Sequence, residues 1–208
     1  MQRHLLNTNA WNRRRYSLYA PFYDLAGRRF DACRRRSLGL LELRPGERVL
    51  LVGAGTGGDL PFLPEGVTAI ASDLTPAMLS RARRHARPGL RPGLAVMDGH
   101  GLAVRDAACD AAVLHLVLAV LPDPVRCLRE TARVLRPGGR AVVFDKFVRG
   151  ERVPLALRLA NLVTGALATE VTRRFEDVLA AAGAPLRVER DEPALLGGLF
   201  RHLLLRRP

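Results

Sequence analysis

The chain has 208 residues, of which 48% are hydrophobic and 5% aromatic, and its formal charge is +13 at pH 7. A chain of this length can bury about 70% of its unfolded surface in one core but is short for two, so we expect one domain over residues 1–208. The three cysteines are scattered, no apolar run approaches about 18 residues, and the N-terminus lacks an apolar signal core. We therefore expect a cytoplasmic protein without disulfides, metal ligands or a spanning helix.

The basic charge is almost entirely arginine, because Lys146 is the one lysine among 33 basic residues. Residues 1–36 alone hold nine arginines and two aspartates. Codon bias in a GC-rich genome would produce this composition without a function, whereas the functional interpretation is attraction to a lipid surface or to nucleic acid. We expect no nucleic-acid partner, because aromatic residues are not interleaved with the basic runs as stacking platforms.

Short apolar runs alternate with arginine-rich amphipathic stretches, the pattern of a parallel sheet covered by helices on both faces. The predicted strands are residues 48–52, 68–72, 94–97, 111–116, 140–144, 186–190 and 199–205, and the predicted helices are residues 25–41, 76–85, 124–135 and 173–182. The sequence thus predicts an α/β fold with a seven-stranded, mostly parallel sheet.

Several turn residues set the ends and lengths of these elements. Thr75 and Pro76 suit a helix cap followed by its first residue, and Gly183 should end the last helix. Pro61 and Pro64 should keep the first crossover helix short. The connection over residues 191–198 is too short for a crossover helix, so the last strand should be antiparallel.

A glycine cluster follows the first predicted strand directly, with Gly53, Gly55 and Gly57 in alternate positions. Glycine lets a backbone turn sharply and approach a ligand closely. Asp73 lies 18 residues past Gly55, at the end of the second strand, where a carboxylate can bind two ribose hydroxyls. This spacing suits an NAD site as well as a nucleoside-type methyl donor, and a plain tight turn with a helix cap is a third interpretation.

Three later features separate these interpretations. Asp98 and Gly99 follow the third strand, an apolar strand over residues 110–118 ends in a loop, and the run Arg-Val-Leu-Arg-Pro-Gly-Gly over residues 133–139 joins a helix to the fifth strand. In this order, residues 47–145 resemble the core of class I S-adenosylmethionine (SAM)-dependent methyltransferases. The resemblance implies a Rossmann-like fold, SAM as the methyl donor and S-adenosylhomocysteine as its product.

The resemblance also assigns roles to residues of the core. It implies that the glycine loop lines the methionine end of SAM, that Asp73 holds the ribose, that adenine lies between apolar side chains with its amino edge on a carboxylate, and that the end of the fourth strand lies near the sulfonium. The donor-binding residues are then Gly53, Ala54, Gly55, Thr56, Gly57, Asp73, Leu74, Met78, Asp98, Gly99, His115, Leu116 and Val117. Core packing of Met78 and a turn-forming role of Asp98 are the structural alternatives.

Within this class the chain is most similar to bacterial phosphatidylethanolamine N-methyltransferases, in residues 16–24, 55–61 and 118–124. This implies an enzyme that methylates the amine headgroup of phosphatidylethanolamine or a similar amphiphile. The first two stretches also resemble methyltransferases of quinone precursors, and the short helix of the glycine loop resembles small thiol methyltransferases. A soluble small-molecule methyltransferase, for a quinone precursor, a thiol or a secondary metabolite, is therefore the alternative. Residues 145–147 read Asp-Lys-Phe where many lipid-type relatives carry an Asn-His-Phe-like run, which leaves the acceptor contacts there open.

An amine acceptor must lose a proton before it attacks, because a primary ammonium has a pKa of about 10. His115 at the end of the fourth strand is the candidate base, and a capped or core histidine is the alternative. Tyr16 and Tyr23 are placed by the resemblance as aromatic groups that cap the donor pocket and face a methylated ammonium, or that merely pack in a lid.

The two ends of the chain are expected to serve the acceptor. Residues 1–42 should form a helical lid or membrane-surface segment, because aromatic residues and leucines mix there with arginines; a solvated helix packed on the domain is the alternative. Residues 150–208 should hold a substrate cover and the final β-hairpin. Residues 153–169 are apolar nearly all round and suit an acyl chain, a bilayer surface or a buried helix. An anionic membrane is therefore the expected partner, with peripheral attachment to its inner face, and the oligomeric state stays open.

Overall fold

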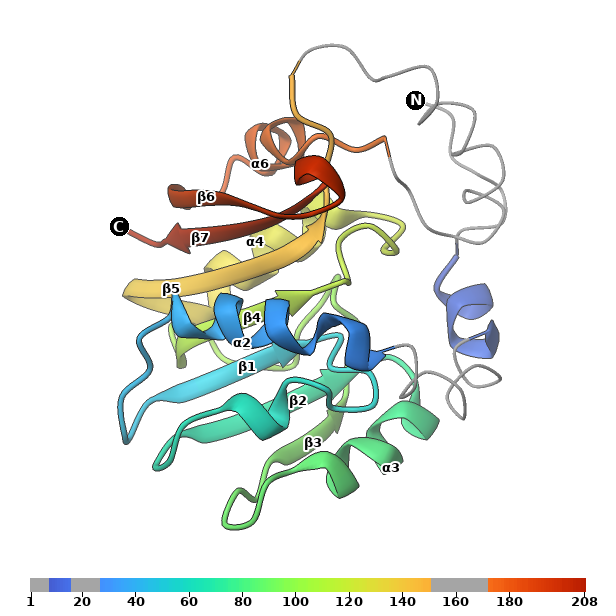
Figure 1. The fold of residues 1–208 in the computed structure, drawn as a ribbon, viewed down its shortest axis with the longest axis vertical. Coiled ribbons are helices and arrows are strands. Elements are labelled where there is room, and N and C mark those ends of the chain that lie inside the picture. Colours follow the sequence, from blue (N-terminus) through green and yellow to red (C-terminus); the bar gives the residue numbers. More distant parts are fainter. Residues whose placement is uncertain (1–7, 16–26, 151–171) are drawn as a thin grey trace.

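The computed structural model describes residues 8–15, 27–150 and 172–208. Its centre is one seven-stranded sheet in the order β3-β2-β1-β4-β5-β7-β6 (Figure 1). The strands are β1 (Arg48–Val52), β2 (Thr68–Asp73), β3 (Gly93–Val96), β4 (Cys109–His115), β5 (Leu135–Lys146), β6 (Arg187–Leu195) and β7 (Phe200–Arg206). The first five strands pair in parallel, and β7 is antiparallel to both β5 and β6. The predicted fold class is confirmed.

Helices cover both faces of this sheet. They are α2 (Asp31–Gly39), α3 (Pro76–His85), α4 (Pro124–Val134) and α6 (Phe175–Ala182), with 3-10 turns η1 (Arg28–Phe30), η2 (Leu60–Phe62) and η3 (Leu196–Gly198). Residues 9–15 form a further short helix, which lies beyond the carboxyl ends of the central strands (Figure 1). Within the described ranges, no helix is long and apolar enough to cross a bilayer.

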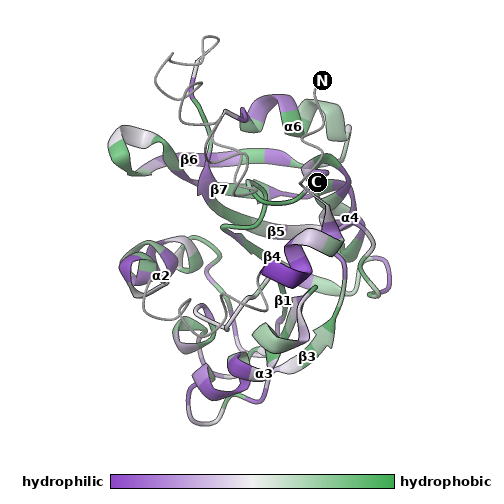
Figure 2. Ribbon diagram, turned by 90° about the vertical axis from the view of Figure 1, so that its right-hand side faces the viewer, coloured by the Kyte–Doolittle hydropathy of each residue, from purple (hydrophilic) through white to green (hydrophobic). Residues whose placement is uncertain are grey.

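Alternation along the central strands divides the core into two clusters, because successive side chains of a strand point to opposite faces. In β1, Val49 and Leu51 pack toward α2 and η2, whereas Leu50 and Val52 pack toward α4 and α6. Figure 2 looks at the carboxyl ends of the parallel strands and shows hydrophobic central strands between helices with hydrophilic surfaces. A strand that is apolar on both faces is therefore buried on both faces.

Some predicted details hold and others need correction. The first crossover is only the short turn η2, as the prolines indicated, and Gly183 ends α6 with φ 55°. The regular α-helix starts at Asp31 instead of residue 25, and β5 begins at Leu135 because Leu135 already pairs with Cys109 of β4. Thr75 does precede α3, but its side chain makes no capping hydrogen bond; its hydroxyl bonds Asp73 instead.

Candidate functional site

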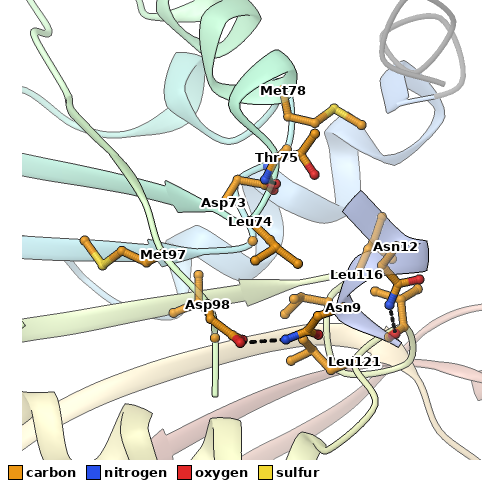
Figure 3. A pocket seen from close by; sticks show the side chains of 16 residues that line it. Asn9, Asn12, Asp73, Leu74, Thr75, Met78, Met97, Asp98, Leu116 and Leu121 are labelled. Carbon is orange, nitrogen blue, oxygen red and sulfur yellow. Dashed lines mark hydrogen bonds between the residues drawn. The ribbon is translucent and has the colours of Figure 1, made fainter. Parts of the chain in front are cut away.

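A cavity of about 680 Å³ opens at the carboxyl ends of β1, β2 and β4 (Figure 3). Its position follows from the strand order, because the chain runs outward from β1 to β2 and β3 and then returns to place β4 on the other side of β1. Crevices at such switch points are the usual ligand sites of open α/β sheets. It is lined by Asn9, Asn12, Val52, Gly53, Gly55, Asp73, Leu74, Thr75, Met78, Met97, Asp98, Gly99, Leu116, Val117, Val120 and Leu121.

The glycine loop forms one wall of this cavity and tolerates only glycine at its key position. Gly53 has φ +66°, and a Cβ atom built there would lie 2.5 Å from Cγ2 of Val117. Gly55 also has a positive φ, 56°. The left-handed backbone is costly for residues with a side chain. The loop therefore brings bare backbone to the edge of the cavity.

Asp73 ends β2 and holds the loop in this conformation. Its Oδ2 accepts a hydrogen bond from the Gly55 N–H at 2.9 Å, and its Oδ1 accepts one from the Thr75 N–H at 2.8 Å. Burial raises the pKa of Asp73, and the bonds from Thr75 and Gly55 oppose that rise. The Thr75 hydroxyl also bonds this carboxylate, which leaves Asp73 one lone pair for a hydroxyl donor from a ligand.

The far end of the cavity carries a second carboxylate, that of Asp98. Its Oδ1 accepts a hydrogen bond from the His100 N–H at 2.9 Å, and its Oδ2 accepts one from Nδ2 of Asn9 at 2.6 Å. Met78 and Leu74 line the same space. The site thus places a carboxylate at each end and apolar side chains between them, which suits a nucleoside.

Leu116 follows β4 with φ 56°, an unusual value for a residue other than glycine. Its N–H donates to the Phe144 carbonyl at 2.8 Å, which holds this conformation, and Leu116 and Val117 line the cavity. Strained backbone of this kind is concentrated at functional sites. This strain could not be predicted from sequence, because leucine does not favour the left-handed region.

Ala54, Thr56, Gly57 and His115 do not line the cavity, although the resemblance placed them in the donor site. Ala54 and Thr56 are buried residues of the loop. At Gly57 a Cβ would lie 2.8 Å from Cα of Ala82, so this glycine allows α3 to pack closely against the loop.

His115 is enclosed by protein groups on both ring nitrogens. Its Nδ1 lies 2.7 Å from Oδ1 of Asp59, and its Nε2 lies 2.9 Å from the hydroxyl of Ser37 in α2. Only 1% of its side chain is exposed. Asp59 in turn pairs with Arg34 at 2.9 Å. These contacts favour a positioning role for His115; its role as a base stays a prediction.

The pKa of Asp59 reflects this network. Burial alone would raise it, but electrostatic interactions and hydrogen bonds with His115 and Arg34 lower it well below its usual range. The buried carboxylate is therefore ionised and joins α2, the glycine loop and β4.

Other predicted site residues lie elsewhere. Tyr16, Tyr23 and residues 153–169 fall outside the described residues, so their roles stay predictions.

At the end of β5, the Asp145 carboxylate is buried and accepts a hydrogen bond from the Ala119 N–H at 2.9 Å. Phe147 packs on Phe175. Lys146 lies over the Phe200 ring, 5.8 Å from its centroid, and burial lowers its pKa.

The structure adds Asn9 and Asn12 to the site, from the helix over residues 9–15. Asn12 donates from Nδ2 to the Val120 carbonyl at 3.2 Å. Sequence reasoning missed both asparagines, because nothing in their spacing ties them to Asp98 and Val120, which are 89 and 108 positions away.

Comparison with known proteins places this geometry in a family. Residues 50–143 match the family model described as "Methyltransferase domain". A phosphatidylethanolamine N-methyltransferase of Cereibacter sphaeroides is 35% identical over 207 residues, which is 93% of this chain and 96% of that protein. A demethylmenaquinone methyltransferase of Beutenbergia cavernae is 36% identical over 141 residues, 61% of this chain and 57% of that protein.

Solved structures share the fold at low sequence identity. A putative methyltransferase solved in complex with the Haloferax volcanii Trm112 methyltransferase activator has a TM-score of 0.75 at 17% identity, covering 93% of this chain and 97% of that one. A geranyl diphosphate methyltransferase solved with SAM has a TM-score of 0.72 at 16% identity, covering 86% of this chain and 85% of that one.

Proposed function

Because the chain belongs to the class I SAM-dependent methyltransferases, we propose that it N-methylates the headgroup amine of phosphatidylethanolamine, or of a similar amphiphile, at an anionic membrane surface. The observation that carries this proposal is the extent of the similarity to the Cereibacter sphaeroides enzyme, which covers 93% of this chain. The similarity to the Beutenbergia cavernae quinone enzyme covers only 61%. Likeness beyond the donor-binding core therefore favours a phospholipid acceptor.

The residues of the cavity fit SAM, the methyl donor of this family. Bare backbone at Gly53 and Gly55 suits the close approach of the methionine part, and the remaining lone pair of the Asp73 carboxylate suits a ribose hydroxyl. Leu74 and Met78 can flank adenine, with Asp98 and Gly99 at its amino edge. SAM supplies an activated methyl group on a sulfonium, so the chain itself has mainly to align the acceptor nitrogen and exclude water.

The helix over residues 9–15 supports a membrane-surface location. Asn12 and Arg15 are buried on its inner side, whereas Trp11 is 43% exposed and Arg13 and Arg14 are exposed on its outer side. The inner side of this helix is therefore polar, whereas an ordinary surface helix turns an apolar side inward. Tryptophan and arginine together suit the headgroup region of an anionic bilayer.

A soluble quinone-type acceptor is the second candidate, and the menaquinone-type similarity favours it. The test incubates the protein with methyl-labelled SAM and a panel of phosphatidylethanolamine vesicles, demethylated quinols and small thiols. The proposal expects label in the phospholipid fraction. Label confined to a quinol or a thiol would contradict the phospholipid proposal and support a soluble acceptor.

A further inference from the structure

The helix over residues 9–15 closes one side of the donor cavity, and Asn9 is its point of contact with Asp98 (Figure 3). The 2.6 Å bond from Asn9 Nδ2 to Asp98 Oδ2 joins residues that lie 89 positions apart. A second bond, from Asn12 to the Val120 carbonyl, holds the next turn of the helix. The wall at this end of the cavity is therefore built by tertiary contacts of the N-terminal helix.

The carboxamide of Asn9 has one orientation. A carboxylate only accepts hydrogen bonds, so the atom that faces Asp98 must be the donor nitrogen, and the carbonyl oxygen must point away from it. That oxygen, Oδ1, is buried and has no hydrogen-bond partner among the described residues. A buried acceptor without a donor is costly, which indicates that a ligand supplies the donor.

Two residues that line the end of the cavity where the proposed function places adenine thus carry acceptors, which lie on either side of the Asn9 amide nitrogen. They are the carboxylate of Asp98 and Oδ1 of Asn9. The exocyclic amino group of adenine carries two N–H donors, one for each acceptor. Resting on the assignment of the cavity to SAM, we propose that Asn9 is a donor-specificity residue that accepts a hydrogen bond from the adenine amino group beside Asp98.

The proposal makes the cavity selective against a base with an oxygen at this position. A 6-oxo base would turn a carbonyl oxygen toward Asn9 Oδ1 and the Asp98 carboxylate. All three groups are acceptors, so no hydrogen bond could form. Sites built to hydrogen-bond a group reject an analogue that lacks it strongly. The N-terminal helix would therefore contribute to donor recognition itself, in addition to covering the cavity.

The test measures the affinities of S-adenosylhomocysteine and its 6-oxo analogue, S-inosylhomocysteine, by titration calorimetry. The variants are Asn9→Ala, Asn9→Leu, which keeps the bulk, and Asn12→Ala as the matched control. Both Asn9 variants should bind S-adenosylhomocysteine about tenfold more weakly than the parent protein does. Their affinity for S-inosylhomocysteine should be almost that of the parent protein. Asn12→Ala loosens the helix without changing a contact to the amino group of adenine, so it should weaken the binding of both ligands by the same factor.

The ratio of the two affinities decides the outcome. If the Asn9 variants lose both ligands in equal proportion, Asn9 only docks the helix, and the inference is overturned while the donor assignment stands. If the parent protein binds neither ligand, the donor assignment fails and the inference fails with it. Denaturant unfolding of each variant checks that the domain is intact.

Discussion

Nδ1 of His115 lies 2.7 Å from Oδ1 of Asp59, so the last residue of β4 is tied to the segment that follows the glycine loop. The opposite ring nitrogen contacts Ser37 of α2. α2, the segment after the glycine loop and β4 therefore meet at one imidazole. A change at this residue should act through the shape of the loop.

His115→Ala should lower the turnover of an amine acceptor by similar factors at neutral and alkaline pH, because the enclosed ring has no nitrogen left for the acceptor. His115→Gln, which can still bond Asp59, should recover part of the loss. The measurement is the pH profile of kcat for both variants. A loss much larger at neutral than at alkaline pH would instead support the role of base, since the acceptor is already deprotonated at high pH.

Asp59→Asn should destabilise the fold by about 3 kcal/mol at neutral pH, because it removes the buried carboxylate that pairs with the Arg34 guanidinium. The pKa of Asp59 is lowered in the folded protein. The stabilisation by its carboxylate is therefore fully present above the unfolded pKa of about 3.9 and is lost as the pH falls toward the folded value. Urea unfolding at several pH values should show the parent and the variant converging in acid.

The matched control for this prediction is Asp106→Asn. Asp106 also pairs with an arginine, Arg133, at 2.6 Å, but its side chain is 77% exposed. An exposed pair contributes little, so this variant should change the unfolding free energy by less than about 1 kcal/mol. Equal effects at Asp59 and Asp106 would contradict the importance of burial.

Asp73→Ala should weaken SAM binding by on the order of a hundredfold, because it removes charge-assisted hydrogen bonds to the ribose and releases the Gly55 N–H. Asp73→Asn, which keeps one acceptor oxygen, should lose less. Titration calorimetry with SAM measures both, and NADH serves as the control ligand. Binding of NADH in place of SAM would keep the fold but remove the donor assignment.

The protein should float with anionic vesicles at low salt and less so at high salt. Each basic residue near an anionic surface contributes roughly 1 kcal/mol, and salt screens that attraction. Deletion of residues 1–15, and the double change Arg13→Ala with Arg14→Ala, should reduce flotation. Arg83→Ala with Arg84→Ala on α3 is the matched control, because it removes the same charge elsewhere. A parent protein that stays in the soluble fraction at low salt would remove the membrane partner.

The features that could be predicted from sequence are those that depend on residues close to one another in the chain. The bounds of β1 and α3 follow from an apolar run and from a Thr-Pro start, and the glycine loop with Asp73 follows from residues at the ends of consecutive strands. Contacts between distant segments could not be predicted. The bonds of His115 to Ser37 and of Asn9 to Asp98 cross 78 and 89 residues, and no periodicity encodes such pairs.

The most direct test of the proposed function is the position of the transferred methyl group. The protein is incubated with SAM carrying a deuterated methyl group and with anionic vesicles containing phosphatidylethanolamine, and the lipids are fragmented by mass spectrometry. We predict that the label lies on the headgroup nitrogen and that Asp73→Ala abolishes most of it. Unlabelled phosphatidylethanolamine, together with ready labelling of a quinol or thiol by the same preparation, would contradict the account.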